Sequence, residues 1–132
     1  RSTYETFARL YSGGTHKPEW ADRLNAIQKY VFSSTLEEAS WSNSTVVRGD
    51  PVAEVATLKQ QDGGALLILG HGQFAEALLR AGLTDVIDLA IHPLLLGRGK
   101  QFFREAQQAR LRLAAVKTFS QIVKLTYEVD AT

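Results

Sequence analysis

The stretch Ala65-Leu66-Leu67-Ile68-Leu69-Gly70-His71-Gly72-Gln73 decides the fold class, because it joins an unbroken apolar run directly to a glycine turn. Such a run is typical of a central strand that is covered on both faces, as in parallel sheets. The residues after the turn follow a helical pattern that Gly82 ends, and its apolar face is formed by Phe74, Ala75, Leu78 and Leu79. A strand, a tight turn and a helix in this order predict an α/β domain.

Two short segments upstream have the composition of strands. Lys29–Ser33 is β-branched and aromatic, and Ser44–Arg48 is a second short run. The loop between them carries Trp41, for which two interpretations stay open: an anchor packed on the core, or the wall of a site. Asp50 and Pro51 then predict the start of a helix, because Asp caps well and the first helical position needs no N–H.

The chain also opens with a helical pattern. Ser2 to Glu5 has the form of a capping box, and one apolar face follows at helical spacing, made of Tyr4, Phe7, Ala8 and Tyr11. Residues 21–28 could add a short helical turn. The sequence contains no Met, and a helix at residue 2 or 3 has nothing before it to pack on, so we expect upstream residues to be missing. The alternative is a domain that simply opens with a helix.

The C-terminal third predicts three strands. Val86–Leu96 is a long strand that is interrupted or bent near His92-Pro93, and 101–108 is a short helix or helical turn. Arg110–Phe119 and Ile122–Val129 flank Ser120-Gln121 and predict an antiparallel hairpin. Because strands and helices alternate upstream, the full order predicts one domain over 1–132, with a mostly parallel sheet, helices on both faces and an antiparallel C-terminal edge.

Composition restricts the function classes. The 132 residues include 15 Lys and Arg against 14 Asp and Glu, a net charge of +1 that argues against a dedicated nucleic-acid binder. The absence of Cys excludes disulfides and thiolate metal sites, and His16, His71 and His92 lack metal-ligand spacing, so we expect no metal. The apolar runs are far shorter than the ~20 residues that span a bilayer. We therefore expect a soluble, cytoplasmic protein with no membrane partner.

Three segments have features of anion binding. Gly70-His71-Gly72-Gln73 joins a predicted strand to a helix, where glycines permit close backbone approach and helix N–H groups attract phosphate. Ser33-Ser34-Thr35 ends a strand with three hydroxyls, and Arg1-Ser2-Thr3 lies at a helix start. An ordinary tight turn and simple hydroxyl caps are the alternative interpretations. Together the three segments indicate a phosphate-bearing ligand better than any one of them does.

Other candidate sites are weaker. There is no Gly-x-Ser-x-Gly elbow and no Walker loop. Asp85 and Asp88 stand three apart in a predicted strand and therefore point to opposite faces, which makes them a poor acid–base pair. Residues 97–100, Gly-Arg-Gly-Lys, could contact a phosphate, although a solvated turn is the better interpretation.

These strings resemble a known family when they are taken together. Arg1–Glu5 is similar to the Gly-Arg-x-Thr-x-Glu helix start of dihydrofolate reductase-like proteins, and Lys29–Leu36 is similar to their next strand and loop. The run Pro93–Lys100 with Phe103 resembles the Pro-x-x-Leu-Gly-x-Gly-x-x-Phe signature. The likeness covers nearly the whole chain and is nearest to the C-terminal reductase domain of bifunctional riboflavin-biosynthesis deaminase/reductases and their stand-alone relatives. The glycine pair of folate enzymes is split here by His71, which favours the riboflavin branch.

The resemblance implies a three-layer α/β/α dihydrofolate reductase-like fold that binds NADPH. By this resemblance, Arg1, Ser2 and Thr3 would contact cofactor phosphates, and Ser33, Ser34 and Thr35 would contact the adenosine 2′-phosphate. The pyrophosphate would lie against Gly70, His71, Gly72 and Gln73. The family's first strand and loop, which line the nicotinamide and substrate side, would precede Arg1, so no proton donor can be named.

The expected function is NADPH-dependent reduction of a small heterocyclic or carbonyl substrate. A nucleotide-binding module without turnover and a purely structural dimerisation domain are the two alternatives. We also expect a homodimer, because the C-terminal hairpin edge and the apolar Val86–Leu96 strand need to be covered.

Overall fold

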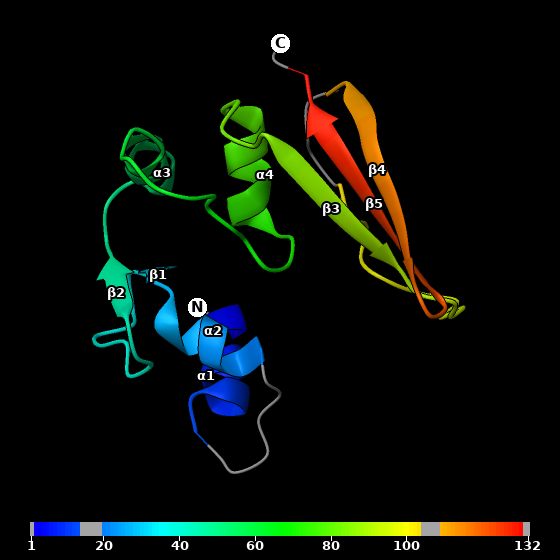
Figure 1. Ribbon diagram of the computed structural model, residues 1–132. Coiled ribbons are helices and arrows are strands. Elements are labelled where there is room, and N and C mark those ends of the chain that lie inside the picture. Colours follow the sequence, from blue (N-terminus) through cyan, green and yellow to red (C-terminus); the bar gives the residue numbers. More distant parts are fainter. Residues whose placement is uncertain (1, 14–19, 104–108, 131–132) are drawn as a thin grey trace. The chain divides into compact units, whose positions relative to one another are not determined.

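The computed structural model describes residues 2–13, 20–103 and 109–130 and contains both helices and strands (Figure 1). The chain divides into two compact units, Arg1–Gly70 and His71–Thr132. No helix within the described residues is long and apolar enough to cross a membrane.

The described residues of the first unit form three helices and a parallel pair of strands. Its elements in chain order are α1 (Ser2–Tyr11), α2 (Trp20–Ala26), β1 (Lys29–Phe32), β2 (Ser44–Val47) and α3 (Pro51–Lys59). The parallel register runs from Lys29 opposite Ser44 to Phe32 opposite Val47. Both strands therefore end at the same edge, which is where ligands of parallel sheets bind.

The start of α3 confirms the predicted cap. Asp50 has extended backbone angles, φ −63° and ψ 119°, and its carboxylate accepts a hydrogen bond of 3.1 Å from the Ala53 N–H. Pro51 occupies the first turn of the helix. The cap satisfies an N–H group that no helical carbonyl can reach, and it fixes where the helix begins after β2.

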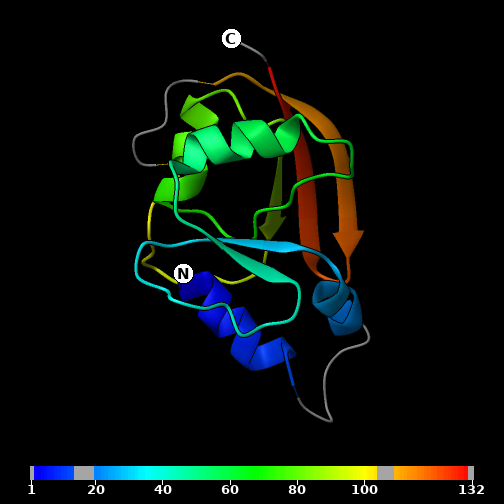
Figure 2. The same ribbon diagram turned by 90° about the vertical axis from the view of Figure 1, so that its left-hand side faces the viewer.

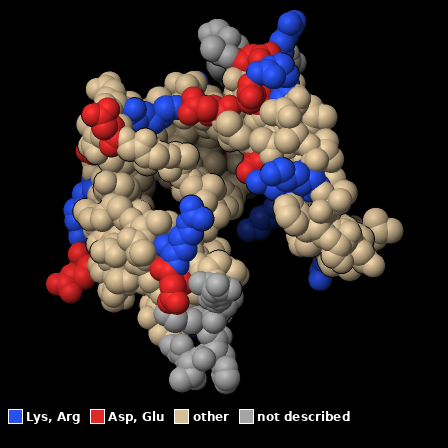
Figure 3. All heavy atoms as spheres, viewed as in Figure 1, with Lys and Arg blue, Asp and Glu red and all other residues tan. Residues whose placement is uncertain are grey.

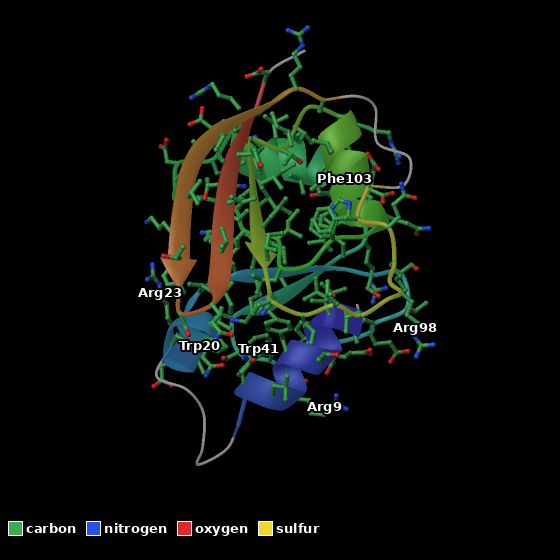
Figure 4. The ribbon with its side chains drawn as sticks, turned by 90° about the vertical axis from the view of Figure 1, so that its right-hand side faces the viewer. Arg9, Trp20, Arg23, Trp41, Arg98 and Phe103 are labelled. Carbon is green, nitrogen blue, oxygen red and sulfur yellow. The ribbon has the colours of Figure 1, made fainter. Side chains whose placement is uncertain are left out.

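Trp41 is a packing anchor of the first unit. Its side chain is buried, its indole N–H donates to Asn25 Oδ1 over 2.5 Å, and its backbone N–H donates to the Tyr4 hydroxyl over 2.9 Å. The Lys29 ammonium lies 4.8 Å from the centre of the ring. Figure 4 shows Trp41 beside α1 and α2, so the loop that carries it is fastened to both helices. This favours the anchor over the site wall.

Lys29 also closes the end of α2. Its ammonium donates to the carbonyls of Leu24 and Ile27, each over 2.8 Å. Burial lowers the pKa of Lys29, although the group keeps these carbonyl partners. A cation at the C-terminus of a helix satisfies carbonyls that lack helical partners and interacts favourably with the helix dipole.

In the second unit, residues 71–103 and 109–130 form one helix and an antiparallel sheet. Its elements are α4 (Gln73–Arg80), β3 (Val86–Ile91), β4 (Leu111–Phe119) and β5 (Ile122–Val129). The strand order is β3-β5-β4, with β5 in the centre, and the three strands lie side by side in Figure 2. The β4–β5 hairpin confirms the prediction, and Ser120 makes its turn with a left-handed φ of 54°.

The predicted core strand over 65–69 is wrong. These residues form no strand and pair with none, and the exposed fraction of Leu67 is 70%. An apolar run indicates that a segment prefers burial, but a strand also needs a neighbour for its backbone hydrogen bonds. Here β1 and β2 pair with each other, so parallel pairing among the described strands is confined to them and the sheet is not mostly parallel.

Two other predicted elements differ as well. β3 ends at Ile91 instead of continuing to Leu96, because Pro93 has no N–H and the Leu94 N–H bonds back to the His92 carbonyl over 2.8 Å. Residues 101–103 of the predicted helix are not helical, and 104–108 lie outside the described residues. The mixed α/β class is confirmed, and the three-layer arrangement stays a prediction.

Candidate functional site

The carboxyl end of β1 continues into a loop, residues 33–37, that we call the hydroxyl loop. The Ser33 N–H extends the parallel pair by donating to the Val47 carbonyl over 3.2 Å. The Ser33 Oγ accepts from the N–H groups of Thr35 and Leu36, over 3.3 and 3.1 Å. The three predicted hydroxyl residues are therefore gathered in one tight turn at the strand end.

The exposure of these hydroxyl residues suits a ligand site. Ser34 and Thr35 are exposed, whereas Ser33 is half-buried beneath them. A hydroxyl carries one donor and two acceptor positions, and both acceptor positions of Ser33 are used by loop amides. The Ser33 hydroxyl proton is therefore left to donate a hydrogen bond, and an anion requires such donors.

Arg48 is a residue that the sequence reasoning missed. It directly follows β2, and its guanidinium donates to the carbonyls of Ser34, Leu36 and Glu37, over 3.3, 2.9 and 3.4 Å. The available signal was its place at the end of the predicted strand Ser44–Arg48, since parallel strands end at a shared edge. The structure brings this cation and the hydroxyl loop together.

The glycine turn, residues 70–73, ends on the first residue of α4, and the division between the two units falls after Gly70. Gly70 has a φ of +87°, a conformation that favours glycine. Gly72 is extended, with φ −177° and ψ −168°, and a Cβ there would meet no heavy atom within 4 Å. A residue with a side chain would therefore be strained at Gly70 but not at Gly72.

Gly72 is the N-cap of α4 and offers no side-chain hydrogen bond to the helix. The first N–H groups of any α-helix lack helical partners and carry the positive end of the dipole. The next residue, Gln73, is exposed. This arrangement suits backbone recognition of a phosphate, because no capping side chain stands in front of the helix start.

His71 points into the second unit and not toward solvent. Its ring stacks on Phe102, with centroids 4.3 Å apart and planes at 18°, and meets the edge of Phe103 at 5.3 Å. Its Nε2 lies 3.6 Å from Glu76 Oε1, and the two side chains are only 15% and 6% exposed. Figure 4 shows Phe103 beside α4. His71 thus fastens the turn to the segment around residue 102.

Glu76, Phe102 and Phe103 are further residues that sequence reasoning missed. Glu76 stands in the first turn of α4, and its side chain is buried against His71 although it carries a carboxylate. The Pro-to-Phe signature pointed to Phe103 but gave no reason to place it against the turn. Only the packing of unit 2 relates these residues to His71.

The remaining predicted positions carry less information. Arg1 lies outside the described residues, and the side chain of Ser2 is also not described. Thr3 is exposed in the first turn of α1. The hydroxyl loop belongs to the first unit, and the described start of α4 belongs to the second.

Charged groups elsewhere form local pairs. The ammonium of Lys124 and the hydroxyl of Thr126 contact the two carboxylate oxygens of Asp88, over 2.8 and 2.6 Å, and hold the pKa of Asp88 below its ordinary value. Arg98 and Lys100 are exposed, as expected for a solvated turn. Basic and acidic side chains are interspersed on the face drawn in Figure 3. No group of three or more metal-ligand side chains occurs in the described part of the chain.

Comparison with known proteins relates the chain to one family. The model of the RibD C-terminal domain matches residues 3–125. A Bacillus subtilis protein, YyaP, is 30% identical over 86% of this chain, and a second, YwjB, is 28% identical over 74% of it; both are uncharacterised. The matched regions amount to 60% and 57% of these two relatives, so the chain spans less than two thirds of either.

A solved structure supports the fold. The crystal structure of a protein from Shewanella sp. PV-4, whose name assigns it provisionally to riboflavin biosynthesis, superposes with a TM-score of 0.70. It shares 18% sequence identity, and the match covers 99% of this chain and 71% of that one. At this identity the likeness concerns the fold alone.

Proposed function

The chain belongs to the RibD C-terminal domain family, and from this premise we propose that it is an NADPH-dependent reductase of a small heterocyclic or carbonyl substrate. A pyrimidine like the 5-amino-6-ribosylaminopyrimidine of riboflavin synthesis is the first candidate. The family match is the observation that carries the proposal, because it covers both loops described above.

The glycine turn fits a dinucleotide pyrophosphate. Its helix start has no side-chain cap, the space where a Gly72 Cβ would lie is open, and His71 is directed away into the unit. A phosphate could therefore approach the backbone N–H groups of Gly72 and Gln73. Backbone donors of this kind need no charged side chain, because the helix dipole adds to their attraction.

The hydroxyl loop fits a second phosphate. A 2′-phosphate distinguishes NADPH from NADH, and it requires donors and a cation near the adenosine ribose. Ser33 and Ser34 offer hydroxyl donors at the end of β1, and Arg48 supplies positive charge beside the loop. We therefore propose that NADPH is preferred over NADH.

The chemistry divides between cofactor and protein. Bound NADPH supplies the hydride, whereas the residues of this chain bind and orient the dinucleotide. The hydroxyl loop would hold its adenosine end, and the glycine turn would hold the pyrophosphate. Such positioning raises the rate by holding the reacting groups at a productive distance.

Calorimetric titration with NADPH, followed by NADPH oxidation assays with pyrimidine and carbonyl substrates, tests the proposal. Binding with substrate-dependent oxidation is the expected result. Binding without oxidation of any substrate would support a nucleotide-binding module instead. The absence of binding to the folded protein would contradict the proposal altogether.

A further inference from the structure

The hydroxyl loop is held by an arginine through its main chain. The Arg48 guanidinium reaches the carbonyls of Ser34, Leu36 and Glu37, so it spans most of the loop. A planar guanidinium offers its donors in a fixed fork, which an ammonium cannot reproduce. The loop conformation and the position of this positive charge are therefore determined together.

This arrangement leaves donors for an anion. A guanidinium has five N–H groups, and the three carbonyl contacts need no more than three of them. Arg48 is exposed, so its remaining N–H groups are accessible. The Ser33 hydroxyl proton is also left as a donor, because loop amides occupy its acceptor positions.

The charge of Arg48 matters because the loop is otherwise acidic. Glu37 and Glu38 are both exposed on this stretch and repel a phosphate dianion. Arg48 contacts the Glu37 carbonyl and not its carboxylate. Its positive charge is therefore not neutralised by an ion pair with that residue, and it can offset the negative charges of the two acidic side chains.

We infer that Arg48 is the residue that sets the preference for a 2′-phosphorylated nucleotide, by ordering the hydroxyl loop and placing a cation beside it. The inference rests on the proposed function, because it assigns the adenosine end of the dinucleotide to this loop. It goes further by naming a residue outside the segments that the resemblance assigned to the cofactor.

The test measures the ratio of two affinities. Calorimetry gives the dissociation constants for NADPH and NADH, and for adenosine 2′,5′-bisphosphate and adenosine 5′-monophosphate as fragments, with wild type, Arg48→Ala and Arg48→Lys. Arg23→Ala is the matched control, because Arg23 is an exposed arginine of the same unit on α2, near the opposite end of β1 (Figure 4).

We expect Arg48→Ala to weaken the binding of NADPH and of the bisphosphate by at least about tenfold, which is the loss expected for one charge-assisted contact. NADH and the monophosphate should change by less than about threefold, since they lack the 2′-phosphate. Arg48→Lys should restore part of the preference, because it keeps the charge but not the fork. Arg23→Ala should leave all four constants unchanged.

The outcomes separate this inference from the proposed function. If wild type binds the bisphosphate with an Arg48-dependent preference but oxidises no NADPH, the inference stands and the reductase proposal fails. If wild type binds NADPH, and Arg48→Ala weakens the affinities for NADPH and NADH equally or changes neither of them, Arg48 is not the specificity residue. If folded wild type binds none of the four compounds, both ideas are wrong. Thermal melts of each variant show whether it is folded.

Discussion

The hydroxyl loop and the glycine turn hold their backbones in different ways. In the loop, an exposed arginine binds three main-chain carbonyls, and the hydroxyl residues above it remain accessible. In the turn, a histidine is withdrawn into the unit, where it stacks on Phe102 and faces Glu76. Arg48 thus both holds the loop and supplies positive charge to it. His71 holds the turn from inside the unit, away from the surface that a ligand would meet.

The difference predicts different sensitivities. Substitutions of Arg48 should alter which ligand binds, because this side chain carries the charge. Substitutions of His71 should lower stability first, because its side chain is buried. Substitutions of Gly72, on the open side of the turn, should abolish binding and leave the fold unchanged.

The largest effect is expected for Gly72→Val. Its side chain would occupy the space in front of α4, and we expect no detectable binding of NADPH. The position is extended and open, so the free energy of unfolding should fall by no more than about 1 kcal/mol. Gly63→Val is the matched control, because Gly63 is also open, with no atom near its missing Cβ.

Titration and thermal melts of both valine variants check this prediction. Normal NADPH binding by folded Gly72→Val would remove the turn from the site. Loss of the fold in Gly72→Val but not in Gly63→Val would mean that Gly72 has a structural role.

The next effect concerns the support of the turn. His71→Ala removes the ring that stacks on Phe102 and one partner of the buried Glu76 carboxylate, so we expect a loss of about 1–3 kcal/mol in unfolding free energy. NADPH binding by the folded fraction should weaken only slightly, because backbone N–H groups would hold the phosphate.

A double-mutant cycle with Glu76→Gln measures the coupling between the two side chains. Glu76→Gln should cost less stability in the His71→Ala background than in wild type. Equal costs in both backgrounds would show that the two side chains do not interact energetically.

A smaller effect is expected at Gly70. Its φ of +87° is strained for a residue with a Cβ, although the space around it is open. Gly70→Ala should therefore lower the unfolding free energy by about 1–2 kcal/mol. Chemical denaturation beside Gly72→Ala checks this, since the extended Gly72 should tolerate alanine. A larger loss in Gly72→Ala would reverse the assignment of strain.

The smallest effect distinguishes a structural charge pair from the charge at the loop. Lys124 and Thr126 lower the pKa of Asp88, so its carboxylate contributes stability above its unfolded pKa and loses that contribution as pH falls through its lower folded pKa. Because the pair is exposed, Asp88→Asn should cost only about 0.5 kcal/mol near neutral pH and less in strong acid. Denaturation at several pH values measures this difference, and a cost of Asp88→Asn that grows as the pH falls through the acid range would contradict it.

The sequence predicted the local elements best where a single residue type determines them. Asp50 and Pro51 located α3, and Ser120-Gln121 located the hairpin, because caps and turns depend on neighbours in the chain. The strand over 65–69 failed because pairing depends on distant partners. The contacts of Arg48 with the hydroxyl loop and the burial of the His71 side chain were missed for the same reason. The homodimer and the single-domain organisation stay predictions.

The most direct test of the account is a crystal structure of the protein grown with saturating NADPH. The account predicts density for the dinucleotide with its pyrophosphate on the N–H groups of residues 70–73 and its 2′-phosphate beside Ser33, Ser34 and Arg48. Ordered NADPH bound elsewhere, or its adenosine end turned away from the hydroxyl loop, would contradict it.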